Sequence, residues 1–194
     1  AQGLFHLPQD LPDWVKGLVP ELERTAMVGA AGVYLGTFKE TKKTVVAWFQ
    51  NGKRTDVSAE SLGSLVKMAM RPDGERALAV GFLRNQVVEI SQDGACRIVL
   101  EESGLGTRDV AYLRDGFAIS TASGIRFYDS VGAKTARTTV PIKEASGMKA
   151  VLGGKALVVE SKNAIHVIDA RGETFEQLAS VKCKDPAGFF EHEG

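Results

Sequence analysis

Short segments in which apolar and polar residues alternate recur along the chain from residue 25 onward. Other segments, such as Val87–Ile90 and Ala156–Val159, are mostly apolar and rich in β-branched residues. Such runs are typical of half-buried or fully buried β-strands. No long amphipathic helical window occurs in the same region. The pattern therefore predicts many short antiparallel strands joined by tight turns.

An internal repeat with a period near 40 residues organises these segments. Two sets of equivalent glycines, here called columns, define the repeat. The first column follows the first strand of each unit, at separations of 42, 42 and 38 residues, and consists of Gly32, Gly74, Gly116 and Gly154. The second follows the third strand of each unit, at separations of 42, 38 and 40 residues, and consists of Gly52, Gly94, Gly132 and Gly172. Asn-Gly and Asp-Gly pairs at several of these positions favour hairpin turns that need positive φ. Each unit then holds four short strands, and radial repetition of such units predicts a β-propeller.

The third strand of each unit carries a further column of bulky residues. It consists of Trp48, Ile90, Tyr128 and Ile168, followed by Phe49, Ser91, Asp129 and Asp169. The pairs Tyr128-Asp129 and Ile168-Asp169 occupy the place of the Trp-Asp pair in WD-type repeats. Over residues 25–181 the chain therefore resembles the broad β-propeller superfamily, with degenerate WD-like repeats that lack both the Gly-His and the Trp-Asp dipeptides. We expect Trp48 to belong to the core.

The repeat divides the chain into two parts. Residues 1–24 form an N-terminal arm, and residues 25–194 hold the propeller repeats, at about 25–60, 65–102, 108–142, 147–181 and a partial unit at 182–194. The fold class is therefore all-β, a small propeller of four to five blades. Three arrangements of the repeats remain open. The ring has five blades, one of which is shared by the two termini, or it has four blades with extra residues at both ends. Alternatively, the chain is a fragment of a larger ring. The arm would supply outer strands of the closing blade, although its prolines at 8, 12 and 20 indicate an irregular course, and Trp14 would attach it to the ring.

Composition narrows the classes of partner. The chain has 24 basic and 24 acidic residues and a formal net charge of zero. It therefore has no general attraction to nucleic acid or to anionic lipid. No apolar run approaches the ~18 residues needed to cross a bilayer. We expect no nucleic-acid partner and no membrane insertion.

The cysteines and the N-terminal residues give information on the cellular compartment of the protein. Cys96 and Cys183 are either two half-buried thiols or one disulfide that closes a loop of 87 residues in an oxidising compartment. Ala1-Gln2-Gly3 is typical of the start left by signal-peptidase cleavage. These features predict a periplasmic or otherwise exported protein, with a cytoplasmic one as the alternative.

Sequence motifs for catalysis and metal binding are missing. The chain has three histidines and no CxxC pair, so we expect no metal and no cofactor. No HExxH, GxSxG, GxxxxGK[ST] or GxGxxG–helix motif occurs, which favours a protein that is not an enzyme. The alternative is a hydrolase or lyase that acts on a sugar or lactone at the ring's central entrance. Its residues would be Glu89, Asp109, Asp115, Glu160 and His166, although a half-exposed structural role is the simpler interpretation of His166.

Loops on one face of the propeller are the best candidates for binding a protein partner. Apolar residues beside arginine on turns are typical of interface hot spots. The candidate contact residues are Phe82, Leu83, Arg84, Asn85, Leu105 and Arg108, together with Lys42 from a small basic loop. The competing interpretation is that Phe82 and Leu83 pack into the core between blades. We therefore predict a non-catalytic protein-binding module.

One more specific hypothesis follows from a second resemblance. The Asp-Gly hairpins and short strands of residues 66–121 are similar in pattern to periplasmic propeller-like immunity proteins of type VI secretion amidases. This resemblance implies that the partner is a secreted cell-wall-degrading enzyme, whose cleft an exposed loop would enter. A scaffold subunit of an envelope assembly is a further alternative.

Overall fold

Four separate antiparallel sheets make up the part of the protein that the structure describes. The structure is a computed structural model, which describes residues 12–18, 24–40, 43–57, 65–81, 85–171 and 174–183. Over these residues it is all-β, with 60% strand and 4% helix. Each sheet has four strands, and in each the strands are neighbours in sequence order. The predicted all-β propeller with four-stranded units is therefore confirmed.

Each sheet is built from four consecutive strands of the chain. Sheet 1 contains β1 (Arg24–Ala30), β2 (Val33–Glu40), β3 (Lys43–Gln50) and β4 (Lys53–Val57). Sheet 2 contains β5 (Leu65–Met70), β6 (Arg76–Gly81), β7 (Gln86–Ser91) and β8 (Cys96–Glu101). Sheet 3 contains β9 (Asp109–Leu113), β10 (Gly116–Thr121), β11 (Gly124–Tyr128) and β12 (Thr138–Val140). Sheet 4 contains β13 (Ala145–Val151), β14 (Ala156–Ser161), β15 (Ala164–Asp169) and β16 (Gln177–Lys182).

Tight turns with positive φ join strands in sheet 1. Asn51 and Gly52 have φ of 50° and 72°, and Ala31 and Gly32 have φ of 50° and 73°. Two successive residues with positive φ are the hallmark of the type I′ hairpin, whose twist matches that of the flanking strands. The Asn-Gly turn that the sequence predicts at 51–52 thus has the expected backbone conformation.

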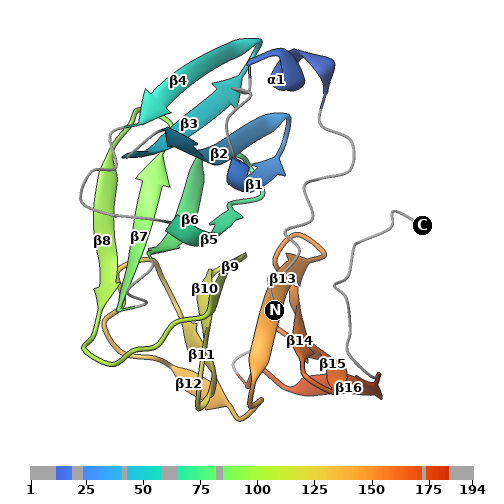
Figure 1. Ribbon diagram of the computed structural model, residues 1–194. Helices are drawn as coiled ribbons and strands as arrows, with labels where there is room; N and C mark the ends of the chain where they lie inside the picture. The colour runs from blue at the N-terminus through green and yellow to red at the C-terminus, as the bar shows by residue number, and fades with distance from the viewer. Residues whose placement is uncertain are drawn as a thin grey trace.

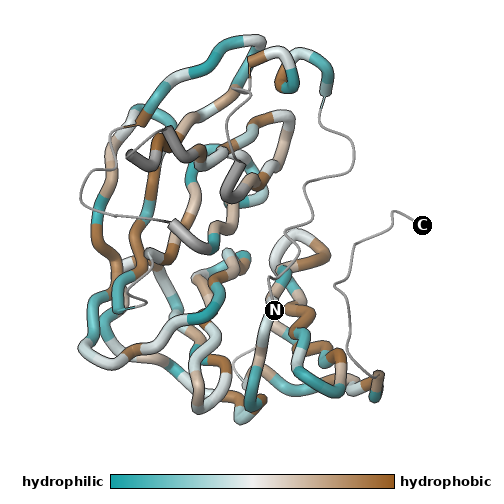
Figure 2. Tube along the Cα trace, in the orientation of Figure 1, coloured by the Kyte–Doolittle hydropathy of each residue, from teal (hydrophilic) through white to brown (hydrophobic). Residues whose placement is uncertain are grey.

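Three apolar layers hold neighbouring sheets together. The third-strand column, formed by Trp48, Ile90, Tyr128 and Ile168, is fully or almost fully buried in these layers, so the expectation that Trp48 belongs to the core is confirmed. Residues of sheets 1 and 2 form one layer, those of sheets 2 and 3 the next, and those of sheets 3 and 4 the third. The innermost strands also meet in order, β1 against β5, β5 against β9 and β9 against β13. Hydropathy along the trace shows apolar residues in all four sheets (Figure 2).

The sheets follow one another around an arc. Figure 1 shows them in sequence order, with sheet 4 standing apart from sheet 1. Among the described strands, no contact between sheets 1 and 4 matches those between successive sheets. The predicted partial unit at 182–194 lies outside the described residues except for Lys182 and Cys183, so the strands expected to close the ring are not part of this description.

A short helix covers the free face of sheet 1. Helix α1 (Asp13–Leu18) follows Pro12, whose carbonyl accepts a 2.9 Å hydrogen bond from the amide of Val15. Val15 is buried among residues of β1–β3. The Trp14 ring makes an edge contact with Tyr34 in β2, at 6.1 Å between centroids. Trp14 thus attaches the arm to sheet 1 as predicted. Residues 13–18 are helical, and residues 1–11 and 19–23 of the arm lie outside the described residues, so the outer strands expected from the arm stay a prediction.

Candidate protein-binding surface

The connection between sheets 2 and 3, here called loop 102–108 after its residues, is fixed by its own buried side chains. Gly104 and Gly106 have positive φ of 72° and 62°, so the chain reverses direction on both sides of Leu105. Leu105 is 3% exposed and belongs to the layer between sheets 2 and 3, and Thr107 is also buried. The amide of Leu105 donates a 3.1 Å hydrogen bond to the carbonyl of Glu102, which closes the turn.

Neighbouring strands hold the same loop from both sides. The amide of Glu102 donates a 3.0 Å hydrogen bond to the carbonyl of Asn85, just before β7. Gln86 Nε2 donates a 2.6 Å bond to Glu101 Oε1. Arg126 Nη1, on β11 of sheet 3, contacts Glu102 Oε2 at 3.0 Å and Oε1 at 3.3 Å. The loop is therefore tied to both sheets that it connects.

An exposed tip results from these anchors. Glu101, Glu102, Ser103 and Gly104 are exposed in sequence, and Asn85 and Arg108 are partly exposed beside them. We call these six residues the loop surface. Exposed groups on a rigid backbone lose little conformational entropy on binding, which favours tight recognition.

The predicted contact residues have mixed outcomes. Asn85 and Arg108 lie on the loop surface, but Phe82, Leu83, Arg84 and Lys42 lie outside the described residues. The expectation that Leu105 is a surface contact is wrong, because the two positive-φ glycines turn its side chain into the core. Sequence reasoning missed Glu101 and Glu102, and also Arg126, whose place between Ile125 and Phe127 in an alternating strand indicated an outward-pointing charge.

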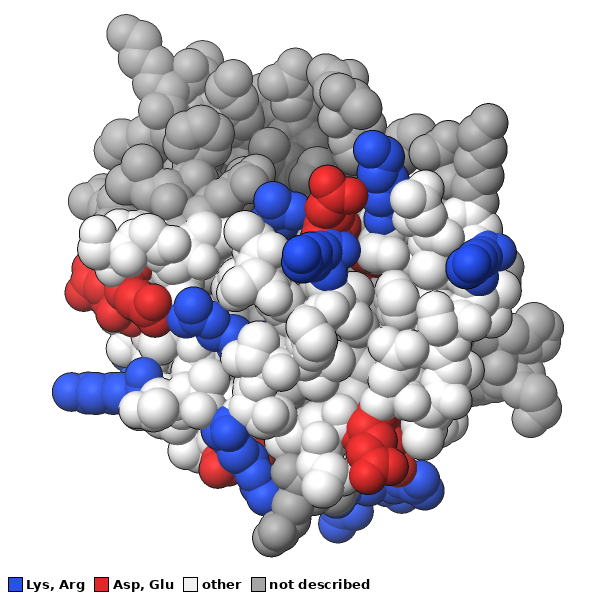
Figure 3. Space-filling view, turned by 90° about the horizontal axis from the view of Figure 1, so that it is seen from below, with Lys and Arg blue, Asp and Glu red and all other residues white. Residues whose placement is uncertain are grey.

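Charge on the surface is mixed in sign. Figure 3 shows basic and acidic side chains interspersed on the side seen from below, with no large area of one sign. Several pairs neutralise each other directly, such as Arg171 with Asp169, at 2.6 Å between Nη2 and Oδ2, and Arg137 with Asp129, at 2.8 Å. Arg171 also holds the pKa of Asp169 down to about 2. The side seen in Figure 3 therefore offers no extended area of one sign that would steer a charged partner toward it.

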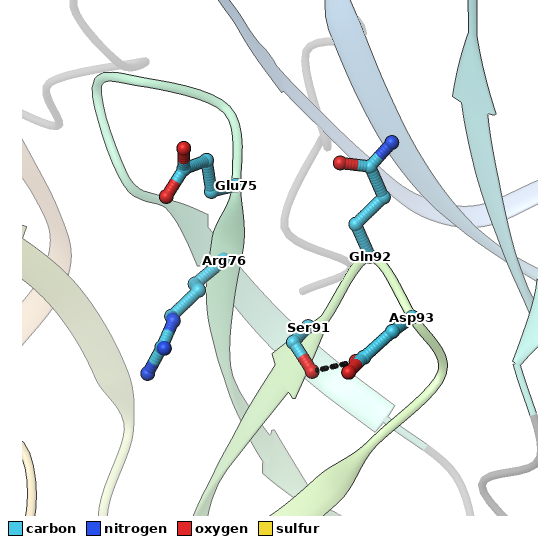
Figure 4. A pocket seen from close by; sticks show the side chains of 5 residues that line it. All are labelled: Glu75, Arg76, Ser91, Gln92 and Asp93. Carbon is cyan, nitrogen blue, oxygen red and sulfur yellow. Dashed lines mark hydrogen bonds between the residues drawn. The ribbon is translucent and has the colours of Figure 1, made fainter.

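A shallow depression lies at the other end of β7 and β8. It is lined by Glu75 and Arg76 at the start of β6 and by Ser91, Gln92 and Asp93 in the β7–β8 turn (Figure 4). Ser91 Oγ donates to Asp93, which lowers the pKa of that carboxyl. Since Asp93 also accepts a 3.1 Å bond from the amide of Ala95, the turn is satisfied by its own hydrogen bonds. Both signs of charge line this open depression, so it favours no particular ligand.

Glu89 is the centre of an ion-pair network and is not arranged as a catalytic acid. The side chain is 5% exposed, and three donors from strands of sheets 2 and 3 converge on it. They are Tyr112 Oη at 2.8 Å from Oε1, and Arg97 Nε at 2.7 Å and Arg76 Nη1 at 3.2 Å from Oε2. This arrangement satisfies the buried charge, as a structural carboxylate requires.

Asp109 is buried at the start of β9. Its Oδ1 accepts a 2.8 Å bond from the amide of Val110, and Oδ2 accepts one of the same length from the amide of Met148 in β13. Burial raises the pKa of Asp109 to about 6, although Lys67 and the two amides oppose the rise. Both oxygens therefore accept backbone hydrogen bonds, and the bond to Met148 joins sheet 3 to sheet 4, which favours a structural role over proton transfer.

The remaining candidates for a catalytic site are distributed over the fold. Glu160 is near enough to Asp109 to raise its pKa, and Ser146 Oγ donates to Glu160 at 3.3 Å. His166 faces the layer between sheets 3 and 4, with Nε2 at 3.1 Å from Ser161 Oγ, and Asp115 is exposed in the β9–β10 turn. The structure thus brings Asp109 and Glu160 into one neighbourhood, while Glu89 is held by its own ion-pair network and His166 by Ser161.

Within the described residues, both cysteines are on or next to outer strands. Cys96 and Cys183 are free thiols, so the predicted alternative of a disulfide is not formed. Cys96 lies on β8 of sheet 2 and Cys183 follows β16 of sheet 4. Within the described ranges there is no group of three or more His, Cys, Asp or Glu residues placed to hold a metal ion. Nor does this part of the chain contain a helix long and apolar enough to span a bilayer.

Radially stacked four-stranded meanders joined by short loops define the class of protein: it is a β-propeller. No protein-family model and no curated protein matches the sequence. Among solved structures, the chain is similar to a β-propeller chain in the crystal structure of a nidogen/laminin complex, with a TM-score of 0.63 and 11% identity over 80% of this chain. The chain covers 62% of the length of that protein chain. At this identity the similarity shows the fold alone.

Proposed function

We propose that the protein is a non-catalytic binding module that docks a protein partner through the loop surface. The observation that carries this proposal is the fixation of loop 102–108, whose Glu102 bonds to both Asn85 and Arg126 while Glu102, Ser103 and Gly104 stay exposed. Binding residues are often found on loops that a rigid scaffold positions. The solved neighbour was crystallised in a nidogen/laminin complex, which supports the use of a propeller as a platform for a protein partner.

A more specific form of the proposal concerns the partner. The resemblance to propeller-like immunity proteins suggests an exported inhibitor of a secreted cell-wall-degrading enzyme. In that role, the tip at Ser103 and Gly104 would enter the enzyme's cleft and cover its nucleophile. The absence of a bulky side chain at the tip supports this, because small residues allow a loop to enter a narrow cleft.

Site-specific photo-crosslinking tests the docking surface. A photoreactive residue is placed at Ser103 in one variant and, as a matched control, at the exposed Gln92, at the opposite end of the same two strands. In the cells that naturally express the protein, Ser103 should give one specific crosslinked species and Gln92 none. Equal crosslinking at the two positions, or none at Ser103, would show that the loop surface is not the docking site.

The crosslinked partner then tests the finer claims. With the partner purified, Glu102→Lys should weaken binding at least about tenfold, because it reverses a charge on the surface and breaks the contact with Arg126. Glu75→Lys, in the depression at the other end of the strands, is the control. If the partner is a hydrolase, adding the propeller should abolish its cleavage of peptidoglycan. Fractionation of the expressing cells tests the exported location.

A further inference from the structure

The outermost strand of sheet 4 is exposed along its whole length. All six residues of β16 are exposed, and Leu178 and Val181 are 57% and 63% accessible. Such a strand presents backbone amides and carbonyls, as well as apolar side chains, to another strand. The register with β15 is irregular at Leu178 and regular from Ala179 to Lys182.

The outer strands of the other sheets carry features that oppose strand pairing. In β4, Lys53, Arg54 and Asp56 place charge along most of the strand. In β8, Arg97 is charged, and two of the six residues are buried. The third outer strand, β12, has only three residues. Charge and short length protect sheet edges from association, and β16 has neither, because its one charge, Lys182, is at its end.

Within the described part of the chain, the outward face of sheet 4 is also less covered than the equivalent positions in sheets 2 and 3. Val87, Ile125 and Ile165 occupy equivalent positions on the third strands of sheets 2, 3 and 4, three residues before the buried third-strand column. The next sheet buries Val87 and Ile125 fully, whereas Ile165 is half-buried. One residue before that column, Phe127 is fully buried and Val167 is half-buried. Pairing in the sheet continues this apolar face through Ala179 and Val181 on β16.

The sequence of β16 is self-complementary about Ser180. If two copies of the strand pair antiparallel around a two-fold axis at Ser180, Ala179 of each lies opposite Val181 of the other. Ser180 then meets its own counterpart, and Lys182 lies opposite Leu178. Apolar pairs opposite one another stabilise a sheet, while like charges in that position destabilise it. This register makes two apolar pairs and no like-charge pair.

We propose that β16 pairs antiparallel with β16 of a second copy of this chain. The protein would then be a dimer in which sheet 4 of one copy joins sheet 4 of the other edge to edge. The contact is isologous, so it closes after two copies. A head-to-tail stack of sheet 4 on sheet 1 is opposed by α1, whose Val15 already covers the free face of sheet 1. The proposal does not depend on the loop surface.

Sedimentation and light scattering test the dimer directly. Between about 1 and 100 μM, the wild-type chain should show a concentration-dependent mass that approaches twice the 20.8 kDa of one chain. Ser180→Lys and Ser180→Glu each place two like charges on the axis, so each variant alone should associate at least about tenfold more weakly. An equimolar mixture of the two variants should restore association, because the charges on the axis then differ in sign.

The matched control is Thr55→Lys, which adds the same charge to the exposed outer strand of sheet 1 and should leave the dimer unchanged. Circular dichroism of each variant checks that the fold is kept. A wild-type chain that stays monomeric over the whole range overturns the proposal. A dimer that survives Ser180→Lys, or that Thr55→Lys weakens equally, also overturns it.

Discussion

Tyr112 Oη donates a 2.8 Å hydrogen bond to Glu89 Oε1 across the layer between sheets 2 and 3. Glu89 lies on the third strand of sheet 2, and Tyr112 on the first strand of sheet 3. Burial and the bond to Glu89 raise the pKa of Tyr112, so the phenol remains a donor at any ordinary pH. Two arginines on sheet 2 supply the other bonds to the carboxylate, so Tyr112 is the partner that makes this network an inter-sheet connection.

This network predicts an order of stability losses. Tyr112→Phe removes a donor to a buried charge, and should lower the free energy of unfolding by about 2 kcal/mol. Arg97→Ala should cost less than about 1 kcal/mol, because the Arg97 side chain is 58% exposed and Arg76 remains. Urea unfolding of the two variants measures the difference. A larger loss for Arg97→Ala would contradict the assignment of Tyr112 as the main connection.

Asp109 predicts a dependence of stability on pH. Its pKa is about 6 in the folded chain and about 3.8 when unperturbed, so between these values the folded state holds a proton that the unfolded state releases. Stability from this group is therefore greatest below pH 4 and is lost as the pH rises through 6, by about 3 kcal/mol in total. The difference in unfolding free energy between wild type and Asp109→Asn should change by about that amount from pH 3 to pH 8. A difference that does not vary with pH would contradict the raised pKa.

The sequence could predict which residues are buried within a repeat unit. The alternation and the two glycine columns are local features, so they fix strand positions, turns and the third-strand column that includes Trp48 and Ile168. Helix α1 was not predicted, because its six residues are too few for a helical period to emerge and Pro12 indicates an irregular course. Its burial depends on a tertiary contact with sheet 1, which local patterning does not encode.

The candidate site was harder to predict, because its properties depend on contacts between repeats. Leu105 resembles a surface contact in sequence, and only the path of the chain between two sheets shows that it is core. The sequence alone makes Glu89 a candidate catalytic acid, and only the structure shows that Tyr112 and two arginines satisfy its carboxylate. Likewise, Ile165 and Val167 have the same sequence pattern as buried residues of sheets 2 and 3, although they are only half-buried. Periodicity shows that a face of a strand is apolar, but not whether another sheet covers that face.

The free thiols predict the outcome of alkylation without reductant. Both Cys96 and Cys183 should be modified in the unfolded protein, giving two adducts per chain by mass spectrometry. In the folded protein Cys96 should react more slowly than a model thiol at pH 8, because burial raises its pKa and lowers the thiolate fraction. A mass with no adducts and two fewer hydrogens would instead indicate the disulfide.

The glycine column predicts a contrast between two kinds of substitution. Gly154 and Gly94 both have positive φ, of 79° and 85°, so alanine is strained at either position. A Cβ at Gly154 would also lie 2.4 Å from the backbone nitrogen of Arg114 in sheet 3, whereas one at Gly94 would meet nothing within 4 Å. Gly94→Ala should therefore cost about 1 kcal/mol, from backbone strain alone.

Gly154→Ala should cost at least about 2 kcal/mol more, because its turn packs on the β9–β10 turn of sheet 3 and accepts a 3.1 Å hydrogen bond from the amide of Arg114. Gly52→Ala, which has φ of 72° and open space around it, provides a second control with strain but no contact. Thermal and urea unfolding of the three variants separate the two effects. Equal losses at all three positions would show that strain alone, and not the contact with the β9–β10 turn, explains the requirement for glycine at position 154.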